Sequence, residues 1–424
     1  MPGKVKTKKS SSHSWWLQAE TPEIPVEEGK PWYALYTPKR INAASYQQKK
    51  LAEEIRSHVE THFNSELERY HSHKKKHASS DEKWMNQVIK TGTLSDKIAA
   101  LALKVQSSPI HELETMDILV AMSQRKEQRM AQFAIEALKD LLIHNILPDR
   151  KLIPFHQQDL TGEITLTEGM IMIFEDKLIS RISTIVDALE NGLKATVDYY
   201  KKFCMGICAD WLIAKPEQEK RLLIMLVQKL GDQTGGANSK TTQLLKNVLT
   251  QHPAMKETVV NEVQEYIHRP NLPMKSVFSG ILFLNQILIT AKDSALAAKL
   301  ITIYIGLFEK TIQQSELSSK MLTSLFNGIN KCFPYLKDKS VLERHLDTIF
   351  KIVHVSSFTT ATQALQLISF IAMQDSNRRL KSSDVDVTAI DESTQRPDIK
   401  SRFYRALYEK LLAEQVYCMI SKVT

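Results

Sequence analysis

The stretch VLERHLDTIFKIV, residues 341–353, places apolar side chains at the spacing of an α-helix. The apolar positions, three, four and seven residues apart, are Leu342, Leu346, Ile349, Phe350 and Val353. Side chains at this spacing form one apolar stripe along a helix. Because a helix cannot bury such a stripe alone, this segment predicts a helix that packs against other helices.

The same pattern recurs from about Leu94 to Met373, interrupted by short segments rich in Pro, Gly and Ser. No segment has the pattern of a β-strand. The distance from one helix start to the next but one is roughly 35–46 residues, the period of HEAT and armadillo repeats. The sequence therefore predicts an all-α fold, a HEAT/armadillo-like α-solenoid with a partly disordered basic N-terminal arm.

Composition and periodicity divide the 424 residues into four expected parts. A basic N-terminal arm with one long helix comes first, then the helical-repeat solenoid, a polar linker without periodicity, and a C-terminal helical stub that begins SRFYRALYEKLL. The expected bounds are, in the same order, residues 1–80, 81–374, 375–400 and 401–424.

Two local features of the solenoid follow from its polar residues. Ser95 is a candidate N-cap because it stands directly before an apolar periodic run that includes Ile98 and Leu101. Residues 156–170, HQQDLTGEITLTEGM, are the least helical stretch of the body, since threonines alternate there with apolar residues and glycines. We expect a loop over these residues.

The charge of the chain is concentrated in the arm. The whole chain has a formal net charge of +8, and residues 1–80 hold 14 Lys/Arg against 9 Asp/Glu. A basic arm ahead of a near-neutral body is typical of a nonspecific grip on nucleic acid or an acidic partner, although a solubilising, disordered tail has the same composition. The candidate contacts to nucleic-acid phosphates are Lys4, Lys6, Lys8, Lys9, Lys74, Lys75 and Lys76.

Other patterns argue against membrane insertion and disulfides. No apolar run reaches the ~18 residues that span a bilayer, and the start of the chain lacks the apolar core of a secretory signal. The four cysteines are Cys204, Cys208, Cys332 and Cys418. They form no CxxC pair, so we expect reduced thiols, with Cys204 and Cys208 packed as small apolar residues.

No catalytic constellation is present in the sequence, so we expect no enzyme activity, cofactor or metal. Residues 231–241, GDQTGGANSKT, lack the lysine that a phosphate-binding loop requires directly after its second glycine, which favours a turn between helices. His71, His73 and His77 have no Cys or carboxylate set at ligand spacing. The LKDLL run at residues 138–142 has the form of a docking motif but is more typical of a helical core.

Eight segments of the chain, in order, carry a resemblance to a known family. They include TGTLSDKIAALALKVQSSP from Thr91, KPEQEKRLLIMLVQKLGD from Lys215, HPAMKETVVNEVQEYIHRPNLP from His252 and HLDTIFKIVHVSSFTTATQALQLI from His345. Together the segments resemble the CCAAT-binding-factor domain family. After Leu412 the chain departs from the family's pattern, which predicts a C-terminally truncated member.

The resemblance implies a non-enzymatic nucleolar scaffold in assembly of the large ribosomal subunit (60S). Its implied partners are precursor ribosomal RNA and another nucleolar-complex protein, within pre-60S particles in the nucleus and nucleolus. The family name implies an alternative, a transcriptional activator on CCAAT-box promoter DNA, but no helix-turn-helix, zinc-finger or basic-zipper signature is present. A carrier or adaptor solenoid would explain the helices equally well, but not the ordered segments.

Overall fold

The computed structural model of this protein describes most of the helical body. The described residues are 15–17, 20–25, 30–40, 46–77, 79–160, 164–313, 319–336, 346–355, 361–362, 364–369 and 399–412. Outside the helices, these residues contain one isolated β-bridge, between Arg40 and Gln158. The all-α class predicted from the sequence is therefore confirmed for the described part of the chain.

The chain divides into two compact units, the first of which consists of Met1–Lys229 and Thr234–Gln251. Its helices are α1 (Tyr46–Lys76), α2 (Ser80–Thr91), α3 (Leu94–Ser107), α4 (Leu113–Ser123), α5 (Gln128–Leu141), α6 (Leu166–Leu193), α7 (Asp198–Ala214), α8 (Glu219–Gln228) and α9 (Ala237–Gln251). A single π-helical turn, η3 (Leu142–Ile146), extends α5.

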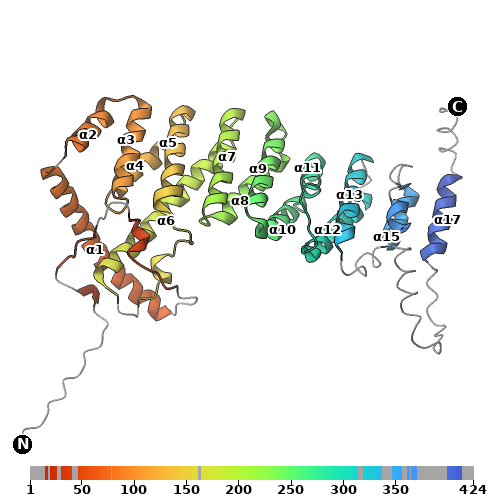
Figure 1. Ribbon diagram of the computed structural model, residues 1–424, viewed down its shortest axis with the longest axis horizontal. Helices are drawn as coiled ribbons and strands as arrows, with labels where there is room; N and C mark the ends of the chain where they lie inside the picture. The colour runs from red at the N-terminus through yellow and green to blue at the C-terminus, as the bar shows by residue number, and fades with distance from the viewer. Residues whose placement is uncertain are drawn as a thin grey trace, which may run out of the picture. The chain divides into compact units, whose positions relative to one another are not determined.

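The helices of the first unit form two rows. In one row α3 contacts α5, α5 contacts α7, and α7 contacts α9; in the other α4 contacts α6, and α6 contacts α8 (Figure 1). Consecutive helices such as α3 and α4, or α6 and α7, pack across the two rows. Each helix therefore buries its apolar stripe between neighbours.

The capping boxes at the starts of α3 and α6 correct two expectations. Thr93, not Ser95, is the N-cap of α3: its hydroxyl accepts the Asp96 N–H, and the Asp96 carboxylate accepts the Thr93 N–H. Thr165 and Glu168 form the same reciprocal arrangement at the start of α6. Because a capping box satisfies two helix-end N–H groups, α6 begins at Leu166 inside the expected loop at residues 156–170.

The long helix expected in the arm is α1, and its apolar face packs on α6. Ile55, Val59 and Phe63 on this face are each 0% exposed. Gly169 of α6 lies where Trp15 of the arm crosses, and a Cβ placed there would come 2.5 Å from the Trp15 ring. The absence of a side chain at Gly169 thus allows the arm to lie directly on α6.

The second unit consists of Leu230–Gln233 and His252–Thr424. Its helices are α10 (Lys256–Ile267), α11 (Met274–Leu284), α12 (Ser294–Gln313), α13 (Ser319–Cys332), α15 (Leu346–Val355) and α17 (Ile399–Leu411). Here α10 contacts α12 and α11 contacts α13, with α10 packed on α11 and α12 on α13. Residues 375–398 of the expected linker lie outside the described residues.

Truncation of Ile349 to alanine is expected to destabilise the second unit by roughly 2–5 kcal/mol, because it leaves a cavity in place of a buried side chain. Ile349 and its neighbour Leu346 are 1% and 6% exposed. Urea denaturation followed by helical circular dichroism measures the loss. The exposed Lys351→Ala on the same helix is the matched control. A loss below about 0.5 kcal/mol for Ile349→Ala, the range of surface substitutions, would show that α15 is not packed as described.

Two further predictions about buried residues are confirmed. Leu138, Leu141 and Leu142 of the LKDLL run are at most 4% exposed, as expected of a helical core. Cys204 and Cys208 are fully buried in α7.

Among the described residues, no helix has the length and apolar character needed to cross a bilayer.

Candidate functional site

The Lys-rich end of α1 meets the start of α2 at a polar corner. Lys74 donates to the Glu112 carboxylate at 2.9 Å and lies 3.6 Å from the carboxylate of Glu82 in the first turn of α2. The Lys74 side chain is only 18% exposed. Lys74 therefore joins α1 to α2 and to Glu112, which precedes α4, and its charge is already balanced by carboxylates.

A network of buried polar groups extends from Glu112 along α1. The His111 ring stacks on the Tyr70 ring with centroids 4.0 Å apart, and His111 Nδ1 lies 2.8 Å from the Ser108 hydroxyl. Its Nε2 atom is 3.5 Å from the carboxylate of Glu66, which accepts the backbone N–H of Ile24 in the arm. The network thus fixes the arm, α1 and the α3–α4 connection relative to one another.

Burial and hydrogen bonding together set the protonation of His111 and Glu112. Desolvation, with smaller contributions from nearby cations, lowers the pKa of His111 to about 4, so the ring is neutral near pH 7. Burial alone would raise the pKa of Glu112, but hydrogen bonds from Thr115 and Lys74 outweigh it and lower the pKa. His111 is therefore neutral because it is desolvated, and Glu112 is ionised because Lys74 and Thr115 bind its carboxylate, so this network is a structural support.

The neighbouring lysines differ from Lys74 because they face solvent. Lys75 and Lys76, both predicted as phosphate contacts, are exposed, as are Lys83 and Lys90 on α2. Among the described residues, no ion pair engages any of these four lysines. We call Lys75, Lys76, Lys83 and Lys90 the basic corner. The other predicted contacts, Lys4, Lys6, Lys8 and Lys9, lie outside the described residues.

Sequence reasoning missed the contribution of α2 to this corner. Lys83 and Lys90 are seven residues apart and therefore lie on one side of the helix, two turns from each other. Trp84, next to Lys83, is 61% exposed although Trp is usually among the most buried residues. The signal in the sequence was an aromatic residue between lysines at helical spacing.

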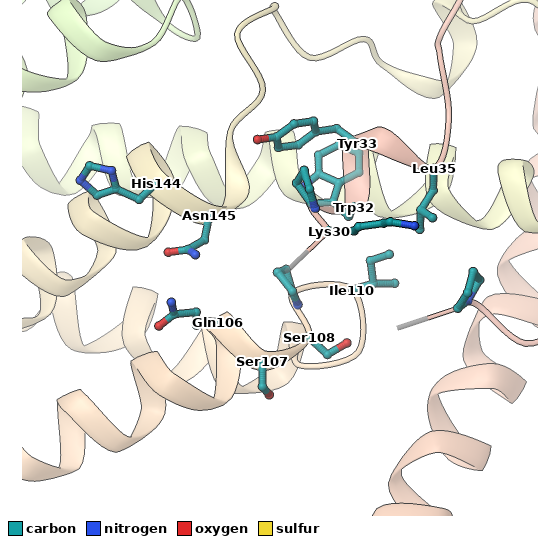
Figure 2. A pocket seen from close by; sticks show the side chains of 13 residues that line it. Lys30, Trp32, Tyr33, Leu35, Gln106, Ser107, Ser108, Ile110, His144 and Asn145 are labelled. Atoms are coloured by element: carbon teal, nitrogen blue, oxygen red, sulfur yellow. The ribbon is translucent and has the colours of Figure 1, made fainter. Parts of the chain in front are cut away.

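The arm also borders a pocket in the first unit. Trp32 is buried, donates its indole N–H to the Ile146 carbonyl at 2.8 Å, and meets the Phe174 ring edge to face at 5.0 Å. Beside it lies a recess of about 360 Å³. Figure 2 shows Tyr33, Gln106 and Asn145 around the recess. Its hydroxyl and amide groups can form hydrogen bonds, and the Ser108 hydroxyl, which also lines the recess, is held by the buried His111 ring of the network described above.

Two buried carboxylates, one on α6 and one between α7 and α8, hold the irregular segment between α5 and α6. The fully buried Glu175 accepts the Arg150 guanidinium at 2.5 Å and the Ile153 N–H at 2.9 Å. Glu217 accepts the Leu152 N–H at 2.8 Å. The charge of Arg150 is thereby used inside the fold.

The buried cysteines and the glycine-rich segment, which could in principle serve catalysis or phosphate binding, have structural roles in the fold. Burial raises the pKa of Cys204 and of Cys332 to about 12, so both thiols are protonated near neutral pH. In the segment 231–241, residues 231–236 form a turn that leads into α9 at Ala237, with Gly235 at a φ of 53° and Gly236 at 74°. In the described part of the chain, no three His, Cys, Asp or Glu side chains are grouped as metal ligands.

Comparison with known proteins finds relatives across several eukaryotes. The chain is 33% identical over 377 residues to CCAAT/enhancer-binding protein zeta of Homo sapiens, which covers 86% of this chain and 33% of that protein. It is 30% identical over 391 residues to ribosome biogenesis protein NOC1 of Chaetomium thermophilum, covering 79% and 36%. It is 26% identical over 351 residues to nucleolar complex protein 1 of Drosophila melanogaster, covering 78% and 28%.

These matches extend over most of the chain but over a limited part of the relatives. The chain spans about a third of the length of each of these three proteins. No family model matches the sequence.

Proposed function

We propose, from the homology of this chain over most of its length to CCAAT/enhancer-binding protein zeta and ribosome biogenesis protein NOC1, that it is a non-enzymatic scaffold in assembly of the large ribosomal subunit. The homology itself confirms the family resemblance identified in the sequence. The observation that carries the proposal is that relatives matching about four fifths of the chain are named for ribosome biogenesis and a nucleolar complex.

The architecture within each unit supports a scaffold role. Two rows of helices, packed in consecutive pairs, are the arrangement of HEAT and armadillo repeats, and we propose a HEAT/armadillo-like α-solenoid on this basis. In such an array each pair contacts only its neighbours, so extended surfaces remain available to partners. Hydrogen exchange tests this: destabilising one pair should raise amide exchange first in the adjacent pairs.

The proposed ligands are precursor ribosomal RNA and another nucleolar-complex protein, in pre-60S particles of the nucleus and nucleolus. The basic corner supports the RNA part, because exposed lysines without carboxylate partners suit a polyanion. Lys74 is assigned a supporting role there, since Glu112 and Glu82 already engage it. No membrane, cofactor or metal is part of the proposal.

Crosslinking in cells tests the proposed function directly. The full 424-residue chain, tagged and crosslinked, should recover precursor RNA of the large subunit together with assembly proteins. Recovery of neither class at levels above an unrelated helical control protein would remove the proposal.

The name of the human relative supports one competing function, recognition of CCAAT-box DNA. A base-reading helix in the major groove would discriminate a CCAAT duplex from a scrambled one by several kcal/mol. Competition between the two duplexes at physiological salt tests this. Equal competition favours the RNA scaffold; strong preference for CCAAT would reverse the ranking.

The four leading lysines are expected to contribute about −3 to the slope of log affinity against log salt for single-stranded RNA. Raising salt from ~50 to ~200 mM would then weaken the arm's share of binding about 60-fold. Deleting residues 1–10 removes Lys4, Lys6, Lys8 and Lys9 and should flatten the slope by that amount in a titration of labelled RNA. The exposed Lys246→Gln on α9 is a single-charge control away from the arm. An unchanged slope after the deletion would show that the arm makes no phosphate contacts.

A further inference from the structure

We propose that Trp84 stacks on an unpaired base of single-stranded RNA whose phosphates contact the basic corner. The inference rests on the proposed RNA-binding function and adds the residue, the strand type and the mode of contact. Its starting point is the exposure of Trp84, 61% of whose surface faces solvent on a helix whose other apolar side chains are half-buried.

Most of the Trp84 side chain takes no part in the packing of α2. The helix α2 packs on α3, and the apolar residues of α2 that are half-buried are Met85, Val88 and Ile89. Trp84 lies outside that face. An indole ring offers a large apolar surface, so leaving it in water is unfavourable unless a ligand covers it.

Hydrogen bonds and an ion pair hold the start of α2, just before Trp84. Ser79 and Glu82 form a reciprocal capping box: the Ser79 hydroxyl accepts the Glu82 N–H at 3.1 Å, and the Glu82 carboxylate accepts the Ser79 N–H at 3.2 Å. The same carboxylate lies 3.6 Å from Lys74. The first turn of α2, directly before Trp84, is therefore attached to the end of α1, which fixes the position of the backbone that carries the ring.

Lysines make up most of the exposed charge at the end of α1 and along α2. Lys83 is adjacent to Trp84, Lys90 lies two turns further along α2, and Lys75 and Lys76 lie at the end of α1. The nearby carboxylates are Glu82, which is already engaged, and Asp81, which is exposed. Cations unbalanced by carboxylates around a flat aromatic surface are the components of a single-strand site, where phosphates meet lysines and bases stack on aromatic rings.

This composition also separates RNA from a protein partner. The buried centre of a protein interface is depleted in lysine, whereas α2 and the end of α1 expose four lysines besides Trp84. A base-paired duplex fits poorly as well, because its bases are already stacked on one another. The ligand that fits this site is therefore an unpaired RNA strand.

Binding of labelled ten-nucleotide poly(U) RNA to the full chain tests the proposal. Trp84→Ala should weaken binding about tenfold, as loss of one stacked base does, and Trp84→Phe should restore most of it. The salt slope should not change, because no phosphate contact is lost. Tyr199→Ala, at a residue 71% exposed on α7, is the matched control and should have no effect.

An abasic strand of the same length gives the decisive comparison. Wild type and Trp84→Ala should bind it equally, because it has phosphates but no bases. Conversely, Lys83→Gln with Lys90→Gln should reduce the salt slope by about 1.4 on either strand. The proposal is overturned if Trp84→Ala binds poly(U) as wild type does, if it weakens the abasic strand equally, or if it releases a protein partner without affecting RNA.

These outcomes are distinguishable from failure of the proposed function. If wild type binds poly(U) and recovers precursor RNA in cells but Trp84→Ala has no effect, the scaffold stands and the stacking site fails. If wild type binds no RNA in either experiment, the RNA part of the scaffold proposal fails as well.

Discussion

Replacing Glu175 with alanine is expected to destabilise the first unit by about 3–5 kcal/mol, the cost of removing one partner of a buried ion pair. Glu175 is 0% exposed and accepts from Arg150 at 2.5 Å and from the Ile153 N–H at 2.9 Å. The substitution would leave the part-buried guanidinium without its partner carboxylate and the N–H without an acceptor. Glu175→Gln keeps one acceptor oxygen and should lose less.

Tryptophan fluorescence during urea denaturation measures this loss in the first unit alone. The five tryptophans of the chain, all within the first unit, are Trp15, Trp16, Trp32, Trp84 and Trp211. The matched control is Glu190→Ala, which removes a solvent-exposed carboxylate that pairs with Lys194 and Arg221 and should cost at most about 1 kcal/mol. Equal losses for the two variants would contradict the structural role of Glu175.

Phe63→Ala is expected to destabilise the first unit by about 3–5 kcal/mol as well, because it empties a fully buried aromatic site between α1 and α6. The Phe63 ring also lies under Lys177 of α6, whose Nζ atom is 5.0 Å from the ring centroid. Loss of this contact should loosen α1 and therefore raise amide exchange along the helix that carries Lys75 and Lys76.

The control for Phe63 is its exposed neighbour, Asn64→Ala. This substitution changes the solvent face of the same helix turn and should alter stability by less than about 0.5 kcal/mol. Urea denaturation followed by tryptophan fluorescence compares the two. If Phe63→Ala left both the unfolding midpoint and α1 exchange at control values, the packing of α1 on α6 would be wrong.

Much of the fold was predictable because helical periodicity is a local property. The apolar spacing in the arm anticipated α1, whose Ile55, Val59 and Phe63 are buried. Helix starts were less predictable. Thr93 rather than Ser95 caps α3, and a capping box starts α6 at Leu166 inside an expected loop. More than one Ser or Thr stands near the start of each of these two helices, and the backbone conformation selects among them.

The candidate site was predictable in part, for a different reason. The run HSHKKKH, residues 71–77, contains the Lys-rich end of α1, but nothing in this run distinguishes Lys74 from Lys75. The distinction depends on Glu112, 38 residues away in sequence and 2.9 Å away in space. Similarly, the exposure of Trp84 depends on which side of α2 packs on α3.

The sequence by itself determined the helical class, the presence of apolar stripes that must pack together, and the similarity to relatives such as CCAAT/enhancer-binding protein zeta and ribosome biogenesis protein NOC1. Each of these follows from residue identity and spacing along the chain. Only the tertiary structure decided which charges are used inside the fold, as with Lys74 and Glu175, and which remain exposed, as with Lys75 and Lys83. The reason is physical: an ion pair depends on the distance between two side chains, and packing sets that distance between residues far apart in the chain.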